Sequence, residues 1–131
     1  MRRLFLALML VVLAAPAAAQ DSPQWRSAPE YDVLLRPWAF EPEVIRLRAG
    51  EPVRLRFVNQ GQATHSFSAP AFFRAARVRR RDAALVADGG FRLGPGERVT
   101  IALVPAPGRY RARSRNLVQR VLGMHAVIVV E

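Results

Sequence analysis

The fold is decided by the last stretch of the chain, Pro107–Glu131, which reads PGRYRARSRNLVQRVLGMHAVIVVE. Its first part alternates arginines with Tyr110, Ala112 and Ser114, which is the period-two pattern of a strand with one buried face. Met124–Val130 is rich in β-branched and apolar residues and predicts a closing strand. The residues between the two strands are expected to form a loop. The chain should therefore end in two strands joined at one end of a sheet.

The amino-terminal residues have the features of a signal peptide. Arg2 and Arg3 precede an apolar run at Leu4–Ala15, and the alanines at Ala17–Ala19 form a small-residue cleavage site. The apolar run is shorter than the roughly 20 residues that a membrane-spanning helix needs, so we expect export to the periplasm and no integral membrane segment. The chain is thus divided into a signal peptide, a flexible leader and one domain, at residues 1–19, 20–30 and 31–131.

Composition limits the chemistry that this chain can perform. It has no cysteine, which excludes thiolate nucleophiles, iron–sulfur clusters and zinc–thiolate sites. Every Lys or Arg position is arginine, 20 in all against 10 acidic residues. An anionic partner fits this charge, and so do arginines that only solvate the outer faces of strands. The basic cluster Arg77–Arg81 has no interleaved aromatic residues for base stacking, so nucleic acid is not an expected partner.

Alternation of apolar and polar residues predicts further strands. In Val53–Phe57 the apolar side chains face one way and two arginines face the other. Val44–Leu47 alternates in the same way. Val33–Phe40 is also extended in character, but Pro37 has no backbone N–H to donate. This strand should therefore lie at an edge of the sheet or bend at the proline.

The segment Ala69–Gly90 interrupts this pattern. It predicts one or two short helices in a long connection, with Phe72 or Phe73 packed against an end of the sheets. Phe91–Leu103 is expected to form a hairpin about the turn Gly94–Gly96. About seven short strands, with helical character confined to one insertion, indicate an all-β fold arranged as a β-sandwich.

Several short motifs occur in the order and at roughly the spacing found in cupredoxins. They are Ala49-Gly50-Glu51-Pro52-Val53, Asn59-Gln60-Gly61 followed by His65-Ser66-Phe67, Leu93-Gly94-Pro95-Gly96-Glu97, Pro107-Gly108-Arg109-Tyr110 and Gly123-Met124. The chain therefore resembles the cupredoxin family over residues 32–131. It is most similar to the small periplasmic copper-binding cupredoxin-like proteins, which share the His-Ser-Phe step that leads into Ala69–Phe73. The resemblance implies a cupredoxin-like Greek-key β-sandwich with a short helical insertion.

The resemblance also implies a copper site, and its ligand positions can be carried over to this chain. The first histidine falls on His65 and the axial methionine on Met124. The cysteine falls on Ser114, the loop histidine on Gln119, and a second histidine frequent in the nearest relatives on Asn116. A serine hydroxyl is not ionised near neutral pH, and an amide oxygen is a weak ligand, so neither replaces thiolate and imidazole. We therefore predict that the type 1 (blue) copper site is lost, and no cofactor is expected.

Two functions remain open. The first is an exported, monomeric binding or interaction protein that is neither an electron carrier nor an enzyme. Its arginines would recognise an acidic protein partner, and the partner-binding residues would be Arg111, Arg113, Arg115 and Arg120. The alternative is a periplasmic copper-handling protein that binds Cu(I) weakly through His65 and Met124, because imidazole and thioether suit Cu(I). His125 should point to the opposite strand face from Met124, toward solvent.

Overall fold

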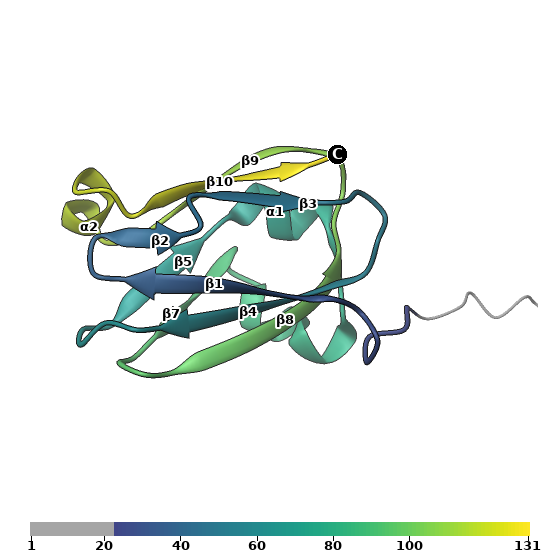
Figure 1. Cartoon of the computed structure of the whole chain (residues 1–131), viewed down its shortest axis with the longest axis horizontal. Coiled ribbons are helices and arrows are strands. Elements are labelled where there is room, and N and C mark those ends of the chain that lie inside the picture. Colours follow the sequence, from purple (N-terminus) through teal and green to yellow (C-terminus); the bar gives the residue numbers. More distant parts are fainter. Residues whose placement is uncertain (1–22) are drawn as a thin grey trace, which may run out of the picture.

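The computed structural model describes residues 23–131, which form a sandwich of two five-stranded sheets (Figure 1). The first sheet has the order β2-β1-β4-β8-β6, formed by Ala39–Glu41, Glu30–Arg36, Val53–Asn59, Arg98–Val104 and Arg77–Val78. The second sheet has the order β3-β10-β9-β5-β7, formed by Val44–Leu47, His125–Val130, Gly108–Arg113, His65–Ser68 and Gly90–Leu93. This arrangement confirms the predicted all-β sandwich.

The chain passes repeatedly between the two sheets. Strand β1 lies parallel to β4, and β3 lies parallel to β10, while the other neighbours are antiparallel. The expected signal peptide at residues 1–19 lies outside the described residues. Within the expected leader, the carbonyl of Pro29 accepts a 2.8 Å hydrogen bond from Arg54 N, and β1 begins at Glu30. No helix in residues 23–131 is long and apolar enough to cross a membrane.

The prediction of a hairpin at Phe91–Leu103 is wrong. Strand β7 pairs with β5 in the second sheet, whereas β8 pairs with β4 and β6 in the first. The turn between them crosses the sandwich and is held by Asn59, the last residue of β4. The Asn59 side chain donates 2.9 Å to the carbonyl of Leu93, and its backbone N donates 2.9 Å to the carbonyl of Glu97.

The bend predicted at Pro37 is confirmed. Strand β1 ends at Arg36, and β2 returns antiparallel to it as the edge strand of the first sheet. Trp38 lies in the tight turn between them with φ of 65°, and its side chain is half exposed. This turn lies at the same end of the sandwich as α2 (Leu117–Val121), on the left in Figure 1.

The core lies between the two sheets. Aromatic rings dominate its centre, where Phe67 of β5 contacts Phe40, Phe57 and Phe91 with ring centroids 4.7–5.9 Å apart. Fully burying one such side chain contributes about 1.5–3 kcal/mol. The strand alternation predicted for Val53–Phe57 is present, because its apolar side chains are buried and the intervening arginines are half-buried on the outside.

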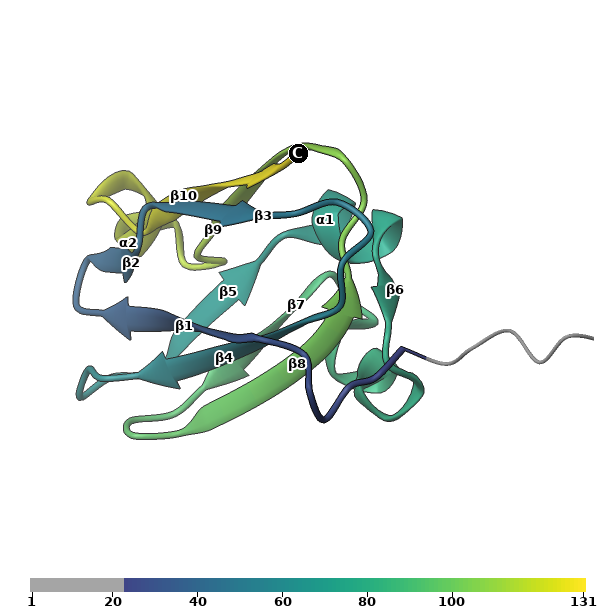
Figure 2. The ribbon, with the colours of Figure 1, turned by 45° about the vertical axis from the view of Figure 1, so that its right-hand side comes forward.

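The helical insertion was predicted and is present. It consists of α1 (Pro70–Ala75), the short strand β6 and the 3₁₀ helix η1 (Arg80–Val86), which lie together on the right in Figure 2. Phe72 and Phe73 are both buried. Asp82 fixes η1 to the sheet, because one carboxylate oxygen accepts 2.8 Å from Arg79 Nε and 2.9 Å from Ala102 N.

Candidate functional site

The segment between β9 and β10 carries most of the expected ligand positions. It contains the five-residue helix α2, where the sequence had indicated only a loop. The two ends of the segment are joined directly, because Ser114 N donates 2.9 Å to the carbonyl of Met124. Asn116 is the N-cap of α2, and its side-chain oxygen accepts 3.1 Å from Gln119 N.

Ser114 lies at the centre of a buried hydrogen-bond network. Its side chain is fully buried, and its Oγ donates 2.9 Å to Oε1 of Gln119. It also lies 3.3 Å from Oγ of Ser66 and accepts 3.2 Å from Asn116 N. Ser66 Oγ in turn accepts 2.7 Å from Arg115 N. The side chains at the positions of the expected cysteine and loop histidine are therefore hydrogen-bonded to each other.

His65, at the start of β5, is 4% exposed, and its Nδ1 has no hydrogen-bond partner. Among the buried side-chain nitrogen and oxygen atoms of residues 23–131, this Nδ1 is the only one without a hydrogen-bond partner. Burying a polar atom without a hydrogen bond lowers the stability of the folded protein by about 1–3 kcal/mol, so other interactions must compensate for the desolvation of Nδ1. On the other side of the imidazole, a Cβ added at Gly61 would lie 2.7 Å from Nε2. The backbone of Gly61 therefore packs tightly against this ring.

His65 shares a cavity of about 280 Å³ with Gln119. The remaining lining comes from the β1–β2 turn and the β4–β5 loop, at Pro37, Trp38, Gln62 and Ala63. The structure thus places His65, the first histidine position, beside Gln119, which the resemblance assigns to the loop histidine. Met124 is fully buried in the core cluster, whereas His125 is exposed, which confirms the alternation predicted for these two residues.

These donors do not fit a type 1 copper site. The carried-over positions supply an imidazole, a thioether, a hydroxyl and an amide, and the sequence has no thiolate. No group of three or more histidine, aspartate or glutamate side chains in the described part of the chain is placed to hold a metal ion. The imidazole of His65 and the thioether of Met124 remain as soft or borderline donors that suit Cu(I).

The outer faces of the two sheets differ in how their arginines are paired. On the first sheet, Arg56 binds Asp32 through two 2.8 Å hydrogen bonds and lies 3.3 Å from Glu30. The hydrogen bond from Arg56 holds the pKa of the Asp32 carboxyl below its ordinary value. On the second sheet, Arg111 and Arg113 are exposed on β9 opposite Val127 and His125, and neither has an ion-pair partner among residues 23–131.

The other two predicted partner-binding arginines lie beyond β9. Arg115 is exposed, and its Nη2 donates 3.0 Å to the carbonyl of Asp88. Arg120 is half-buried within α2. The four arginines therefore extend from the outer face of the second sheet to the end of the sandwich that carries Ser114 and Gln119.

Sequence reasoning missed the exposed apolar surface of α2. Its large exposed side chains, with the last one just after the helix, are Leu117, Val118, Val121 and Leu122. The sequence NLVQRVL already indicates this surface. In a helix, the residues one, four and five positions after Leu117 lie on the same side as Leu117, whereas Asn116 and Gln119 lie on the other side. Arg92 was missed as well, and it lines a second cavity with Arg115 and Gln119.

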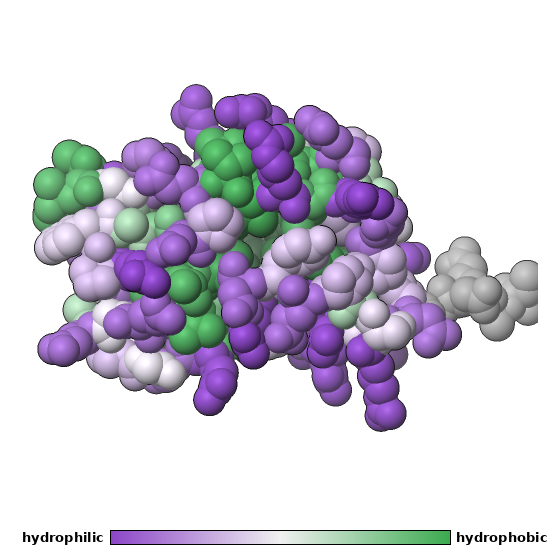
Figure 3. Space-filling view, in the orientation of Figure 1, coloured by the Kyte–Doolittle hydropathy of each residue, from purple (hydrophilic) through white to green (hydrophobic). Residues whose placement is uncertain are grey.

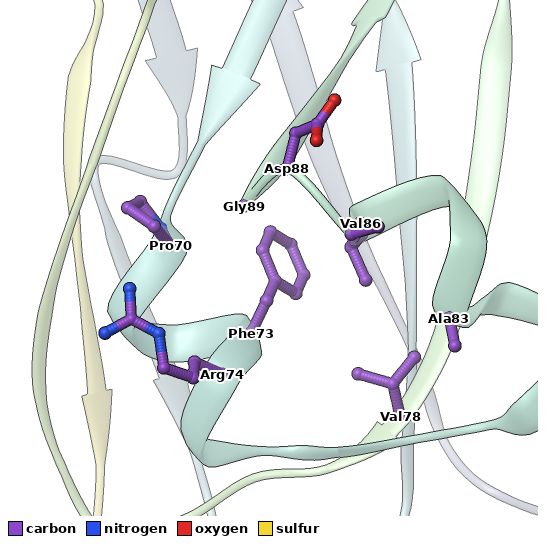
Figure 4. Close-up of a pocket in the computed structure, with 9 residues that line it drawn as sticks. Pro70, Phe73, Arg74, Val78, Ala83, Val86, Asp88 and Gly89 are labelled. Carbon is purple, nitrogen blue, oxygen red and sulfur yellow. The ribbon is translucent and has the colours of Figure 1, made fainter.

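A separate cavity of about 440 Å³ lies between α1 and η1 (Figure 4). Its base is apolar, with Phe73 and Val86 buried, and Arg74 and Asp88 are at its edges. It is formed by the helical insertion and shares no lining residue with either of the two cavities at Gln119.

A β-sandwich of this topology, with a hydrogen-bonded loop before its last strand, is the architecture of a cupredoxin. The family model of the cupredoxin-like domain matches residues 3–130, and the chain belongs to this family. A search of curated protein sequences gives no match.

Solved structures show the same fold at low sequence identity. Dithionite-reduced auracyanin from Roseiflexus castenholzii is 19% identical, with a TM-score of 0.57 over 80% of this chain and 98% of that one. Auracyanin A, a blue copper protein from Chloroflexus aurantiacus, is 18% identical, with a TM-score of 0.55 over 79% of this chain and 100% of that one. A multicopper oxidase from Campylobacter jejuni is 9% identical, with a TM-score of 0.60 over 86% of this chain and 31% of that one.

Proposed function

We propose that this chain is an exported, periplasmic cupredoxin-like binding protein that has lost the type 1 copper site and is neither an electron carrier nor an enzyme. The observation that carries this proposal is the 2.9 Å hydrogen bond between Ser114 and Gln119. The two positions that would supply thiolate and imidazole are occupied by hard oxygen donors that bind each other. Without the thiolate, the protein has no soft anionic ligand to bind copper strongly and couple it to an electron partner.

The basic outer face of the second sheet supports an acidic protein as the partner. Arg111 and Arg113 are exposed and have no carboxylate neighbour in the register, because they lie opposite Val127 and His125 of β10. Arg54 and Arg56 of the first sheet are already paired with Glu30 and Asp32. Unpaired surface charges of one sign raise association rates and select against partners of like charge.

Capture from a periplasmic extract tests this function. The wild-type protein and the double variant R111E/R113E are immobilised, and bound proteins are quantified at low and high salt. Loss of a specific acidic protein in the variant, and in the wild type at high salt, supports the proposal. The matched control R80E/R81E makes the same change in net charge on η1, where both arginines are exposed. Equal capture by wild type and R111E/R113E would show that this face does not bind the partner.

A second candidate function is supported by the unpartnered Nδ1 of His65. This atom is buried and has no hydrogen-bond partner among residues 23–131. His65 shares a cavity with Gln119, the position that the resemblance assigns to the loop histidine. A neutral imidazole nitrogen and the thioether of Met124 would bind Cu(I), which accepts low coordination numbers and soft ligands. The protein would then be a weak carrier of Cu(I) in the periplasm.

Competition with a Cu(I) chelator separates the two functions. The wild type is compared with His65→Ala and with Met124→Leu, which nearly conserves side-chain volume. His125→Ala is the matched control, because it removes an exposed imidazole next to Met124. If His65→Ala and Met124→Leu compete for Cu(I) as well as the wild type does, the copper-handling function is excluded. The test of partner capture is unaffected by that outcome.

A further inference from the structure

Helix α2 is amphipathic, but its polar side faces the protein and its apolar side faces solvent. Its polar side chains, Asn116 and Gln119, take part in the hydrogen-bond network at the end of the sandwich. Its aliphatic side chains point into solvent, and Leu117, Val118, Val121 and Leu122 are 57–74% exposed. They form the hydrophobic surface at the left end of Figure 3, in the place of α2 in Figure 1. A surface helix of a soluble protein normally buries its apolar face, so this surface indicates a binding site.

A polar cavity of about 320 Å³ lies next to this apolar surface. It is lined by Thr64, Ser66, Arg92, Arg115, Asn116 and Gln119, and no carboxylate side chain from residues 23–131 lines it. The amide oxygens of Asn116 and Gln119 are already used, because they accept from Gln119 N and from Ser114 Oγ. Their NH₂ groups therefore remain as donors, together with two guanidinium groups and a hydroxyl. Such a set of donors fits an oxyanion, and arginines bind phosphate oxygens particularly well.

Trp38 lies beside the residue that follows the apolar surface of α2. It is half exposed, and its carbonyl oxygen lies 2.8 Å from a Cβ built on Gly123, directly after α2. It also shares the cavity of His65 with Gln119. Tryptophan is enriched at the boundary between membrane and water, because its ring is apolar and its N–H is polar. One end of the sandwich thus presents aliphatic side chains, an exposed tryptophan and an adjacent cavity of positive charge.

We propose that this end of the protein docks on a membrane surface that contains anionic phospholipids. The aliphatic side chains of α2 enter the interface, and the cavity between Arg92 and Arg115 receives a lipid phosphate. Charge complementarity favours this occupant, because the cavity offers cationic groups and neutral donors directly beside the apolar helix face. A second copy of the chain fits less well, since a stable protein interface uses about 20–30 residues on each side and this apolar surface has far fewer.

The docking site overlaps the arginines predicted to bind the acidic protein partner at Arg115 and at Arg120 of α2, and it leaves out the other two. Arg111 and Arg113 lie on the outer face of β9, whereas the lipid site uses α2, Arg92 and Arg115. Membrane binding therefore does not depend on the proposed partner and can be measured without it.

Sedimentation with vesicles tests the proposal. The exported protein is mixed with vesicles of phosphatidylcholine alone and with vesicles that also contain phosphatidylglycerol. We expect binding only to the second kind. The variants L117S/V121S and R92Q/R115Q should each reduce the vesicle affinity by roughly tenfold or more. The controls are V44S/L85S, which removes two exposed aliphatic side chains elsewhere, and R80Q/R81Q on η1.

Two further measurements distinguish the alternatives. In a Trp25→Phe background, insertion should shift the Trp38 fluorescence to shorter wavelength with phosphatidylglycerol vesicles. Titration with inorganic phosphate tests a soluble anion as the ligand. Phosphate binding that is lost in R92Q/R115Q, without any vesicle binding by the wild type, would overturn the membrane proposal, and so would wild-type vesicle affinity in L117S/V121S. Self-association of the free protein that is abolished by L117S/V121S, again without vesicle binding, would assign the surface to a dimer instead.

Discussion

Oγ of Ser114 donates a 2.9 Å hydrogen bond to Oε1 of Gln119. The resemblance assigns these two positions to the thiolate and the loop imidazole of a blue copper site. Two side chains that would both face a metal ion instead face each other, and the bond joins the end of β9 to α2. Ser114 N also donates a 2.9 Å hydrogen bond to the carbonyl of Met124, so the two ends of the loop are joined.

The closure of this loop predicts that a copper site can be built by two substitutions. The variant S114C/Q119H would supply a thiolate and an imidazole beside His65 and Met124. It should bind Cu(II) with the intense visible absorption of a copper–thiolate bond, whereas the wild type should stay colourless. Q119H alone is the control, since it adds imidazole without thiolate. A folded double variant that remains colourless with Cu(II) would show that the loop does not hold the trigonal geometry.

Gly61→Ala should destabilise the protein by about 1–3 kcal/mol, because the new methyl group overpacks the site. The added Cβ would lie 2.7 Å from Nε2 of His65 and 3.2 Å from Oδ1 of Asn59. Urea unfolding measures the loss, and the imidazole resonances of His65 should shift in NMR spectra. The control Gly96→Ala has a φ of 73° but no atom within 4 Å of its Cβ. It should therefore destabilise through backbone strain while the His65 resonances stay unchanged.

Asp82→Ala should destabilise the helical insertion strongly. It removes the partner of Arg79, whose side chain is only 14% exposed, and leaves Ala102 N without an acceptor. Removing one partner of a buried ion pair typically costs about 3–5 kcal/mol. Glu41→Ala, which breaks the exposed pair with Arg36, should cost only about 0–1 kcal/mol in the same urea experiment. Equal losses in the two variants would contradict the structural role of Asp82.

The hydrogen-bonded pair of Asp32 and Arg56 predicts that the stability of the protein depends on pH under acidic conditions. The pKa of Asp32 is lowered in the folded protein by the hydrogen bond from Arg56, so this carboxyl adds stability that is fully present above its ordinary pKa of 3.8. That contribution is lost as the pH falls through the lower, folded value. The difference in urea midpoint between wild type and Asp32→Asn should therefore be constant near neutral pH and shrink below 3.8. A difference that persists undiminished at lower pH would contradict this assignment.

The sequence predicted the parts of the fold that depend on local pattern. Alternation placed Ala112 and Ser114 inside and Arg111 and Arg113 outside, and it placed His125 at the surface. Local pattern does not reveal which strands are partners. The turn after β7 therefore looked like a hairpin, although the hydrogen bonds of Asn59 carry it across the sandwich.

The candidate site was predicted only in part. Motif spacing identified the positions of His65, Ser114 and Gln119, and the structure gathers them at one end of the sandwich. The contact between Ser66 and Ser114 joins two residues that are 48 positions apart in the sequence, which motif spacing alone does not show. The exposed face of α2 was also missed, because an apolar side chain in a sequence is normally assigned to the core.

The unequal pairing of arginines on the two sheets should affect how the protein is oriented as it diffuses toward a charged surface. Carboxylates neutralise Arg54 and Arg56 on one side of the sandwich, whereas Arg111 and Arg113 on the other side keep their charge. We therefore expect the protein to have an electric dipole across its thickness. As it diffuses toward an anionic surface it should begin to rotate within a Debye length of about 8 Å, before any atoms touch. Added salt would then first weaken the orientation of the protein before it reaches the surface.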